Sequence, residues 1–115
     1  MQDIYLEKKR KDHRANLSSS LSNIVNHLSS IPEVKRVVLF GSYVAGRRDL
    51  FTDLDLLVIM ESDLDFVQRT AELYRQLSFS VDLDMLVYTP EEFGRMKHKG
   101  FMRLAVENGQ VLYEK

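Results

Sequence analysis

The sequence contains no cysteine and no tryptophan, and only two of its 115 residues are proline. Without cysteine, neither a disulfide framework nor a thiolate zinc site can form. No apolar run approaches the roughly 20 residues that a membrane-spanning helix needs. The opening stretch MQDIYLEKKRKDHR has no apolar segment of the kind found in secretory signals. We therefore expect a cytoplasmic protein without a membrane partner.

An excess of basic charge is also missing. Sixteen lysines and arginines face seventeen aspartates and glutamates, so the formal net charge is −1. Proteins that bind nucleic acid through bulk electrostatics usually carry a basic excess. The basic run at residues 8–11 could contact a nucleic acid or a partner, but the balanced charge favours a solvated helix face. The sequence gives no strong signal for nucleic-acid binding and leaves the oligomeric state open.

The chain shows no internal repeat, low-complexity tract or linker, and its length is typical of one domain. We predict a single domain over residues 1–115. Apolar residues recur at steps of three and four near the N-terminus, at Leu17, Leu21, Ile24, Val25, Leu28 and Ile31. This spacing predicts an amphipathic helix over about residues 3–31 that ends before Pro32.

Four short runs rich in β-branched and aromatic residues predict strands at residues 37–40, 56–60, 79–88 and 110–114. Helical spacing predicts a helix from 64 to 77, with Ser62 or Asp63 as its N-cap. A short helix, SYVAG, is expected after Gly41. The order of these elements predicts an α/β or α+β fold, with helices covering one or both faces of a small sheet.

The segment Thr89-Pro90-Glu91-Glu92 has the composition of a helix start, with Thr89 as N-cap, proline in the first turn and Glu92 at the third helical position. Two glycines, Gly94 and Gly100, weaken the helix that follows. A further glycine at 109 is expected to end it.

Carboxylates alternate along two of the predicted strands. Asp53 and Asp55 open the second strand and point the same way, as do Asp82 and Asp84 on the third. If these strands are neighbours, three or four carboxylates converge and repel one another, and a divalent cation relieves that repulsion. Oxygen ligands favour Mg²⁺ or Mn²⁺ over zinc. Such sites often hold two ions about 4 Å apart and support displacement at phosphorus.

The Gly41-Ser42 pair directly follows the first predicted strand. Glycine lacks a Cβ, so a phosphate can approach its backbone. Ser42 at the start of a short helix would favour an anion. Arg47 and Arg48 are candidate phosphate contacts, or simply exposed turn residues. A Gly-Ser pair or an Asp-x-Asp pair alone is a weak signal. Their combination and order predict a site for a nucleoside triphosphate.

This pattern resembles the nucleotidyltransferase superfamily of the DNA polymerase β type, and within it the minimal nucleotidyltransferase (MNT) group. The shared features are Gly41-Ser42, a spacer, Asp53-Leu54-Asp55 opening a strand, and an aspartate on a later strand. The resemblance runs from about residue 15 to the end and departs only mildly at Thr52, where serine is common. It implies an α+β fold with a small mixed sheet and flanking helices.

The resemblance further implies that Asp53 and Asp55 bind metal and that Gly41 and Ser42 bind the triphosphate. Asp84 is expected as the third carboxylate, with Asp82 as the alternative. The implied reaction is Mg²⁺-dependent transfer of a nucleoside monophosphate, here AMP from ATP, to a hydroxyl. MNT relatives are commonly paired with HEPN-type proteins as antitoxin and toxin. The implied acceptor is therefore a hydroxyl of a HEPN-type partner.

Two other functions are compatible with the residues: a binding module that neutralises a partner by contact, and a small-molecule nucleotidyltransferase of the antibiotic-modifying kind. For a protein acceptor, exposed apolar residues near the site would form the docking surface, with Tyr43, Phe51 and Tyr88 as candidates. The three histidines, His13, His27 and His98, lack metal-ligand spacing and are expected to be surface or packing residues.

Overall fold

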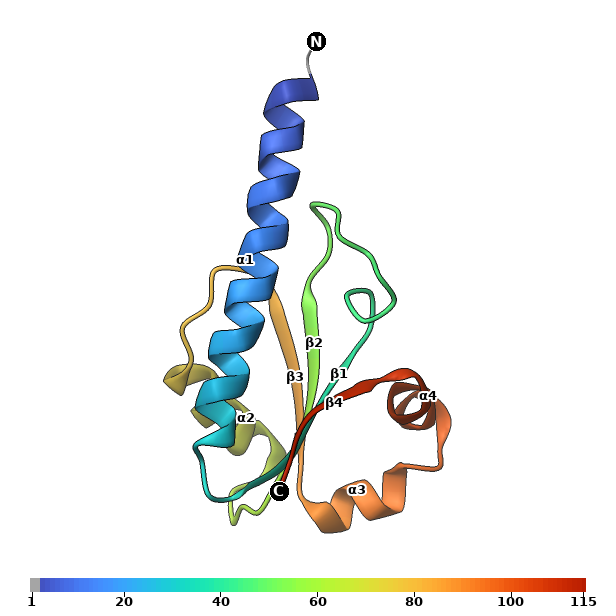
Figure 1. Cartoon of the computed structure of the whole chain (residues 1–115). Coiled ribbons are helices and arrows are strands. Elements are labelled where there is room, and N and C mark those ends of the chain that lie inside the picture. The colour runs from blue at the N-terminus through green and yellow to red at the C-terminus, as the bar shows by residue number, and fades with distance from the viewer. Residues whose placement is uncertain (1–2) are drawn as a thin grey trace.

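The computed structural model describes residues 3–115 and shows a small sheet between two pairs of helices (Figure 1). Along the chain the elements are α1 (Asp3–Ser29), β1 (Val34–Phe40), β2 (Leu54–Met60), α2 (Phe66–Gln76), β3 (Leu83–Tyr88), α3 (Pro90–Met96), α4 (Gly100–Asn108) and β4 (Gln110–Glu114). No helix within this range is both long and apolar enough to cross a membrane.

The sheet has the strand order β3-β2-β1-β4. β1 pairs antiparallel with both β2 and β4, whereas β2 and β3 run parallel. The predicted small mixed sheet with flanking helices is thus confirmed. Parallel neighbours need a crossover connection, and α2 supplies it between β2 and β3. This crossover brings the two aspartate-bearing strands side by side.

Helices cover both faces of the sheet, with α1 and α2 on one face and α3 and α4 on the other (Figure 1). Alternate residues of β2 enter two cores. Leu56 and Val58 pack in the cluster that includes Leu17 of α1 and Leu73 of α2. Leu57 packs in the second cluster, together with side chains of α3 and α4. Because side chains alternate along a strand, Asp55 projects on the same face as Leu57.

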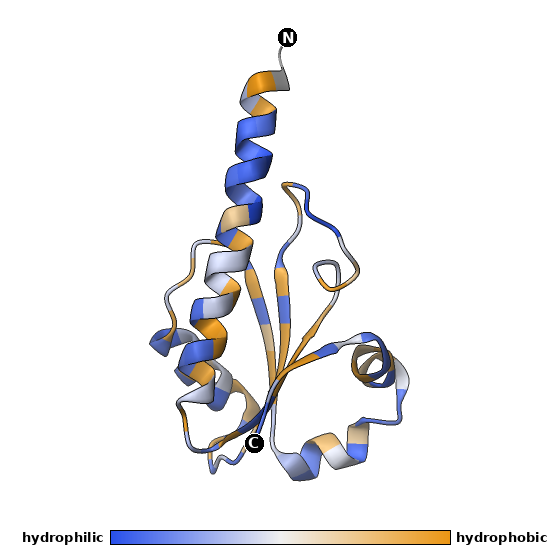
Figure 2. Ribbon diagram, viewed as in Figure 1, coloured by the Kyte–Doolittle hydropathy of each residue, from blue (hydrophilic) through white to orange (hydrophobic). Residues whose placement is uncertain are grey.

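Helix α1 reaches well past the edge of the sheet (Figure 1). Leu17, Ile24 and Leu28 on its second half are fully buried. Its first half is mostly exposed, and Figure 2 shows hydrophilic residues along much of it. The amphipathic pattern found in the sequence therefore describes only the half of α1 that packs on the sheet.

Two local predictions fail at element boundaries. The third strand begins at Leu83 rather than at residue 79. The N-cap of α2 is Asp65, whose carboxylate accepts from Gln68 N, and not Ser62 or Asp63. Ser62 Oγ instead accepts from Leu64 N in the preceding turn. Serine and aspartate serve turns and caps equally well, so composition alone could not separate the two roles.

The prediction of a short helix at SYVAG is also wrong, because residues 42–46 form turns. Their backbone bonds differ in span: Ala45 N donates to Gly41 O, Gly46 N to Tyr43 O and Arg47 N to Ser42 O. Helix continuation needs successive bonds of one span. Ser42 therefore does not lie at a helix N-terminus, and a helix dipole offers no help to an anion at this point.

The capping box at Thr89 and Glu92 is present as predicted. The segment after it divides into α3 and α4, with a break between Met96 and Gly100, in line with the weakening glycines. Helix α4 ends at Asn108 with Gly109 as its C-cap, as expected.

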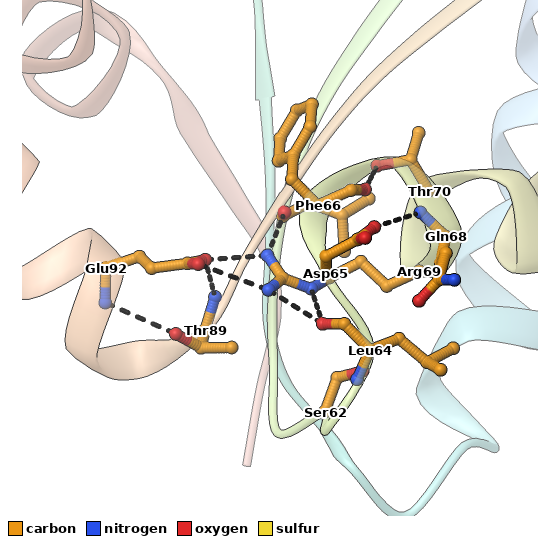
Figure 3. Close-up of polar contacts among 10 residues, drawn as sticks. Ser62, Leu64, Asp65, Phe66, Gln68, Arg69, Thr70, Thr89 and Glu92 are labelled. Carbon is orange, nitrogen blue, oxygen red and sulfur yellow. Dashed lines mark hydrogen bonds and ion pairs between the residues drawn. The ribbon is translucent and has the colours of Figure 1, made fainter.

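A buried arginine that the sequence analysis did not single out joins three elements (Figure 3). The Arg69 guanidinium donates to both carboxylate oxygens of Glu92, at 2.6 and 3.1 Å. It also donates to the carbonyls of Leu64 and Val87. These bonds join the start of α2 to the end of β3 and to α3. They lie at the edge of the sheet where β3 ends, away from the edge where it begins.

Candidate metal and nucleotide site

The order of the strand ends places the candidate residues together at one edge of the sheet. β1 ends at Phe40, while β2 and β3 begin at Leu54 and Leu83. Because β1 is antiparallel to the other two strands, its C-terminal end meets their N-terminal ends. The register pairs Asp55 with Phe40 on one side and with Asp84 on the other.

Asp53, Asp55 and Asp84 form a compact cluster in which one carboxylate oxygen from each lies within 4.8 Å of the others. Asp84 is exposed, and the other two are half-buried. Asp82 is not part of this cluster: it lies just before β3, where its backbone carbonyl accepts from Leu54 N. Strand alternation alone does not separate Asp82 from Asp84, because Asp53 also lies one residue before its strand and still joins the cluster.

The cluster raises the pKa of Asp55 to about 6. Partial burial is the largest cause, and the negative charges of Asp53 and Asp84 add to it. Two carboxylates this close to a third disfavour its ionised form unless a cation is present. Three carboxylate oxygens are also hard ligands, of the kind that Mg²⁺ and Mn²⁺ prefer. The residues present therefore fit a divalent metal site.

Gly41 lies directly against this cluster. Its φ is +80°, and a Cβ at this position would lie 2.2 Å from Asp55 Oδ2 and 2.9 Å from Asp55 Cγ. A contact that short cannot be accommodated without moving the carboxylate. The space left by the missing side chain is thus taken up by Asp55 and not, as had been expected, by a phosphate.

The remaining candidates for phosphate contacts lie in the turns after Gly41. Ser42 is half-buried. Arg47 is exposed, and its Nε donates to Asp49 Oδ2 at 2.8 Å, which raises the pKa of Arg47 and lowers that of Asp49. Arg48 donates to Tyr43 O, and its guanidinium lies 3.5 Å from the centre of the Tyr43 ring. Of the two arginines, Arg47 is the more accessible.

His13 contributes a contact beside the cluster that the sequence analysis missed. Its Nε2 lies 2.9 Å from the carbonyl oxygen of Thr52, the residue before Asp53. The signal was present in the spacing, because His13 is one helical turn before the buried Leu17 on the face of α1 that packs on the sheet. His27 is bonded to Gln76, and His98 is exposed.

The three aromatic residues expected near the site do not lie together. Phe51 is 82% exposed, only two residues before Asp53. Tyr43 is half-buried and packs against the core. Tyr88 ends β3, where it pairs with Ile59 and packs on Phe66, so it lies at the opposite edge of the sheet from Asp84. The prediction that Tyr88 lies near the site was wrong, because most of β3 separates Tyr88 from Asp84.

Solved structures with the same architecture include a putative nucleotidyltransferase from Sulfolobus solfataricus, which aligns with a TM-score of 0.64 at 18% identity over 92% of this chain and 87% of that one. A mutant of the toxin–antitoxin pair MntA-HpeT aligns with a TM-score of 0.53 at 25% identity, over 82% of this chain and 72% of that one.

At the level of sequence, a protein of Methanocaldococcus jannaschii named "Putative protein adenylyltransferase" is 30% identical over 102 residues, or 85% of this chain and 99% of that protein. Residues 22–115 match the family described as "Polymerase beta, Nucleotidyltransferase". That stretch contains β1, the turns at Gly41 and all three clustered aspartates. The chain belongs to the polymerase β-type nucleotidyltransferase family.

Proposed function

We propose that this protein is a Mg²⁺-dependent enzyme that transfers AMP from ATP to a hydroxyl group of a partner protein. The observation that carries the proposal is the cluster of Asp53, Asp55 and Asp84, three carboxylates within 4.8 Å at the edge of the sheet. Such a cluster is unfavourable by itself, as the raised pKa of Asp55 indicates. It becomes favourable when it binds cations.

Asp53, Asp55 and Asp84 would hold the metal, either two Mg²⁺ ions or Mn²⁺ in their place. When bound, divalent ions neutralise charge on the triphosphate and on the carboxylates. Gly41 lies against Asp55, and Ser42 and Arg47 follow it in the turns that lead to Asp53. The backbone of Gly41, together with Ser42 and Arg47, would bind the triphosphate. Arg47 would exchange its exposed pairing with Asp49 for a phosphate, at small cost because exposed ion pairs contribute little stability.

In the reaction, the acceptor oxygen forms a bond to the α-phosphorus, and the bond from that phosphorus to pyrophosphate breaks. Asp84 is the exposed member of the cluster, and in this proposal it would orient the incoming hydroxyl and receive its proton. Phosphoryl-transfer enzymes gain most of their rate from positioning and charge neutralisation. A rigid sheet edge that fixes Asp55 opposite Asp84 supplies the positioning.

A protein acceptor is supported by two of the similar proteins. One, of matching length, carries the name protein adenylyltransferase. The other belongs to a toxin–antitoxin pair. We propose that the partner of the present chain is likewise a protein, of the HEPN type that the MNT resemblance implies. We propose that the reaction takes place in the cytoplasm, which contains both ATP and Mg²⁺.

The experiment that tests this proposal incubates the purified protein with ATP labelled at the α-phosphate, Mg²⁺ and a candidate partner encoded by a neighbouring gene. Label on the partner, lost in Asp53→Asn and retained in Asp82→Asn, is the expected result. Label on a small molecule such as an aminoglycoside would assign the activity to the antibiotic-modifying class. Partner binding without any transferred label would make the protein a non-catalytic binding module.

A further inference from the structure

The stretch that carries Asp53 has little support from the sheet. Asp53 lies one residue before β2, at the end of a connection that begins at Gly41 and contains only turns and irregular backbone. The β2–β3 and β1–β2 ladders begin at Leu54 and Asp55, respectively. A metal ligand must be held to within a fraction of an ångström of its working position. On one side of Asp53, Leu54 N donates to Asp82 O. On the other side, the ladder gives no support at Thr52.

Most bonds that fix this stretch come from within the connection itself. Thr52 N donates to Asp49 O, and Thr52 Oγ1 donates to Asp49 Oδ1 at 3.3 Å. These bonds shape the turn but do not anchor it to the body of the protein. The bond from His13 does, because it joins Thr52 to a residue 39 positions away on α1.

The chemistry of this contact defines the role of the histidine. A carbonyl oxygen can only accept, so His13 Nε2 carries the proton and donates to Thr52 O. Thr52 is 2% exposed and His13 is half-buried, so the bond is partly shielded from competing water. Leu17, one helical turn further along α1, is fully buried, and its packing holds this part of the helix against the sheet.

We propose that His13 is a positioning residue for the metal site: by holding the Thr52 carbonyl, it fixes the backbone from which Asp53 reaches the cluster. This inference rests on the proposed function of the cluster. Residues that orient metal ligands from outside the coordination sphere typically change metal affinity 10- to 100-fold when they are removed. Since His13 acts through the backbone, the lower end of that range is expected.

The test uses Mn²⁺ alone as the probe, titrated into the metal-free protein. His13→Ala and His13→Asn should each weaken Mn²⁺ binding about tenfold, as expected for lost support of a ligand. Asparagine is polar but too short to reach Thr52 O. His13→Gln, whose amide nitrogen can take the place of Nε2, should bind Mn²⁺ close to the wild-type level. His27→Ala, on the same helix but bonded to Gln76, is the matched control and should be unchanged.

Equal Mn²⁺ affinity in wild type, His13→Ala and His13→Asn would overturn the inference, even if the melting temperature falls, because His13 would then only support packing. Failure of His13→Gln to restore binding would overturn it as well. If His13→Ala does not fold, the comparison of asparagine with glutamine decides.

A second measurement separates this inference from the proposed function. Amide hydrogen exchange at residues 53–55 in the metal-free protein should be faster in His13→Asn than in His13→Gln. Unchanged exchange would overturn the positioning role whatever the metal does. Faster exchange in a protein whose wild type binds no Mn²⁺ would uphold the contact between α1 and this stretch, but would contradict the proposed metal site.

Discussion

Gly41 and Asp55 occupy adjoining space, such that a Cβ on residue 41 would lie 2.2 Å from Asp55 Oδ2. Gly41→Ala should therefore displace the carboxylate and abolish Mn²⁺ binding. It should also cost about 1–2 kcal/mol of stability, because residue 41 has a positive φ that L-residues rarely adopt. Isothermal titration with Mn²⁺ and urea unfolding measure the two effects.

Gly46→Ala is the matched control for this substitution. Gly46 also has a positive φ, +100°, but a Cβ there would meet nothing within 4 Å. It should lose a similar amount of stability and keep Mn²⁺ binding. If both variants bind Mn²⁺ equally well, Gly41 serves only the backbone turn and its contact with Asp55 has no bearing on metal.

The stability of the metal-free protein should depend on Asp55 in a defined pH window. Its pKa in the folded state, about 6, is above the ordinary aspartate value of about 3.9. The folded state therefore binds this proton more tightly than the unfolded state, and the stabilisation is complete below about pH 4 and lost as the pH rises through about 6.

Asp55→Asn removes the group that titrates. In EDTA near neutral pH the variant should melt at a higher temperature than wild type, and the difference should shrink as the pH falls toward 4. Asp82→Asn changes a nearby aspartate outside the cluster and should show no such trend. A melting difference between wild type and Asp55→Asn that does not vary with pH would contradict the raised pKa.

Removal of metal provides a related prediction. Adding Mg²⁺ at neutral pH should raise the melting temperature of wild type, because a ligand that binds only the folded state stabilises it. EDTA should reverse the increase. Asp53→Asn and Asp55→Asn should not respond to Mg²⁺, and a full response in either variant would remove that residue from the metal site.

The Arg69–Glu92 pair should matter for stability but not for metal. The side chain of Arg69 is 5% exposed and that of Glu92 is 30% exposed. Arg69→Ala leaves the carbonyls of Leu64 and Val87 without their donor and should cost about 3 kcal/mol in urea unfolding. Arg103→Ala, which breaks the exposed pair with Glu107, should change stability by less than about 1 kcal/mol. Comparable losses in the two variants would contradict this account of the buried pair.

Phe51 is the remaining candidate for partner docking, since it is exposed two residues before Asp53. Phe51→Ala should lower the modification of a protein partner and leave binding of Mg²⁺ and ATP unchanged, because exposed aromatic residues near a site commonly contribute to interfaces. Val67→Ala, at an exposed position on α2, is the control. Equal loss of ATP binding and partner modification in Phe51→Ala would place Phe51 in the nucleotide site instead.

Much of this structure could be predicted from residue patterns. The Asp53-x-Asp55 pair could be located because strands alternate faces, and the helix start at Thr89 because a capping box has a recognisable composition. The absence of Asp82 from the cluster could not be predicted in this way. Alternation applies to Asp82 and Asp84 alike, and only the packing of the site separates them.

Long-range polar contacts were also hidden from the sequence. Arg69 resembles any helix arginine until α2 is packed beside the end of β3 and the start of α3. The spacing could place His13 on the packed face of α1, but its partner is visible only when α1 is docked next to Thr52. The role of Gly41 could not be predicted either. The sequence indicated that glycine leaves room for a phosphate, but the register between β1 and β2 shows that it leaves room for Asp55.

Nucleotidyl transfer at the aspartate cluster can be distinguished from transfer of the terminal phosphate by comparing ATP labelled at the α-phosphate with ATP labelled at the γ-phosphate. We expect covalent label on the partner protein only from the α-labelled nucleotide, only with Mg²⁺ or Mn²⁺, and not with Asp53→Asn. Transfer from γ-labelled ATP, or undiminished transfer from α-labelled ATP by Asp53→Asn, would contradict it.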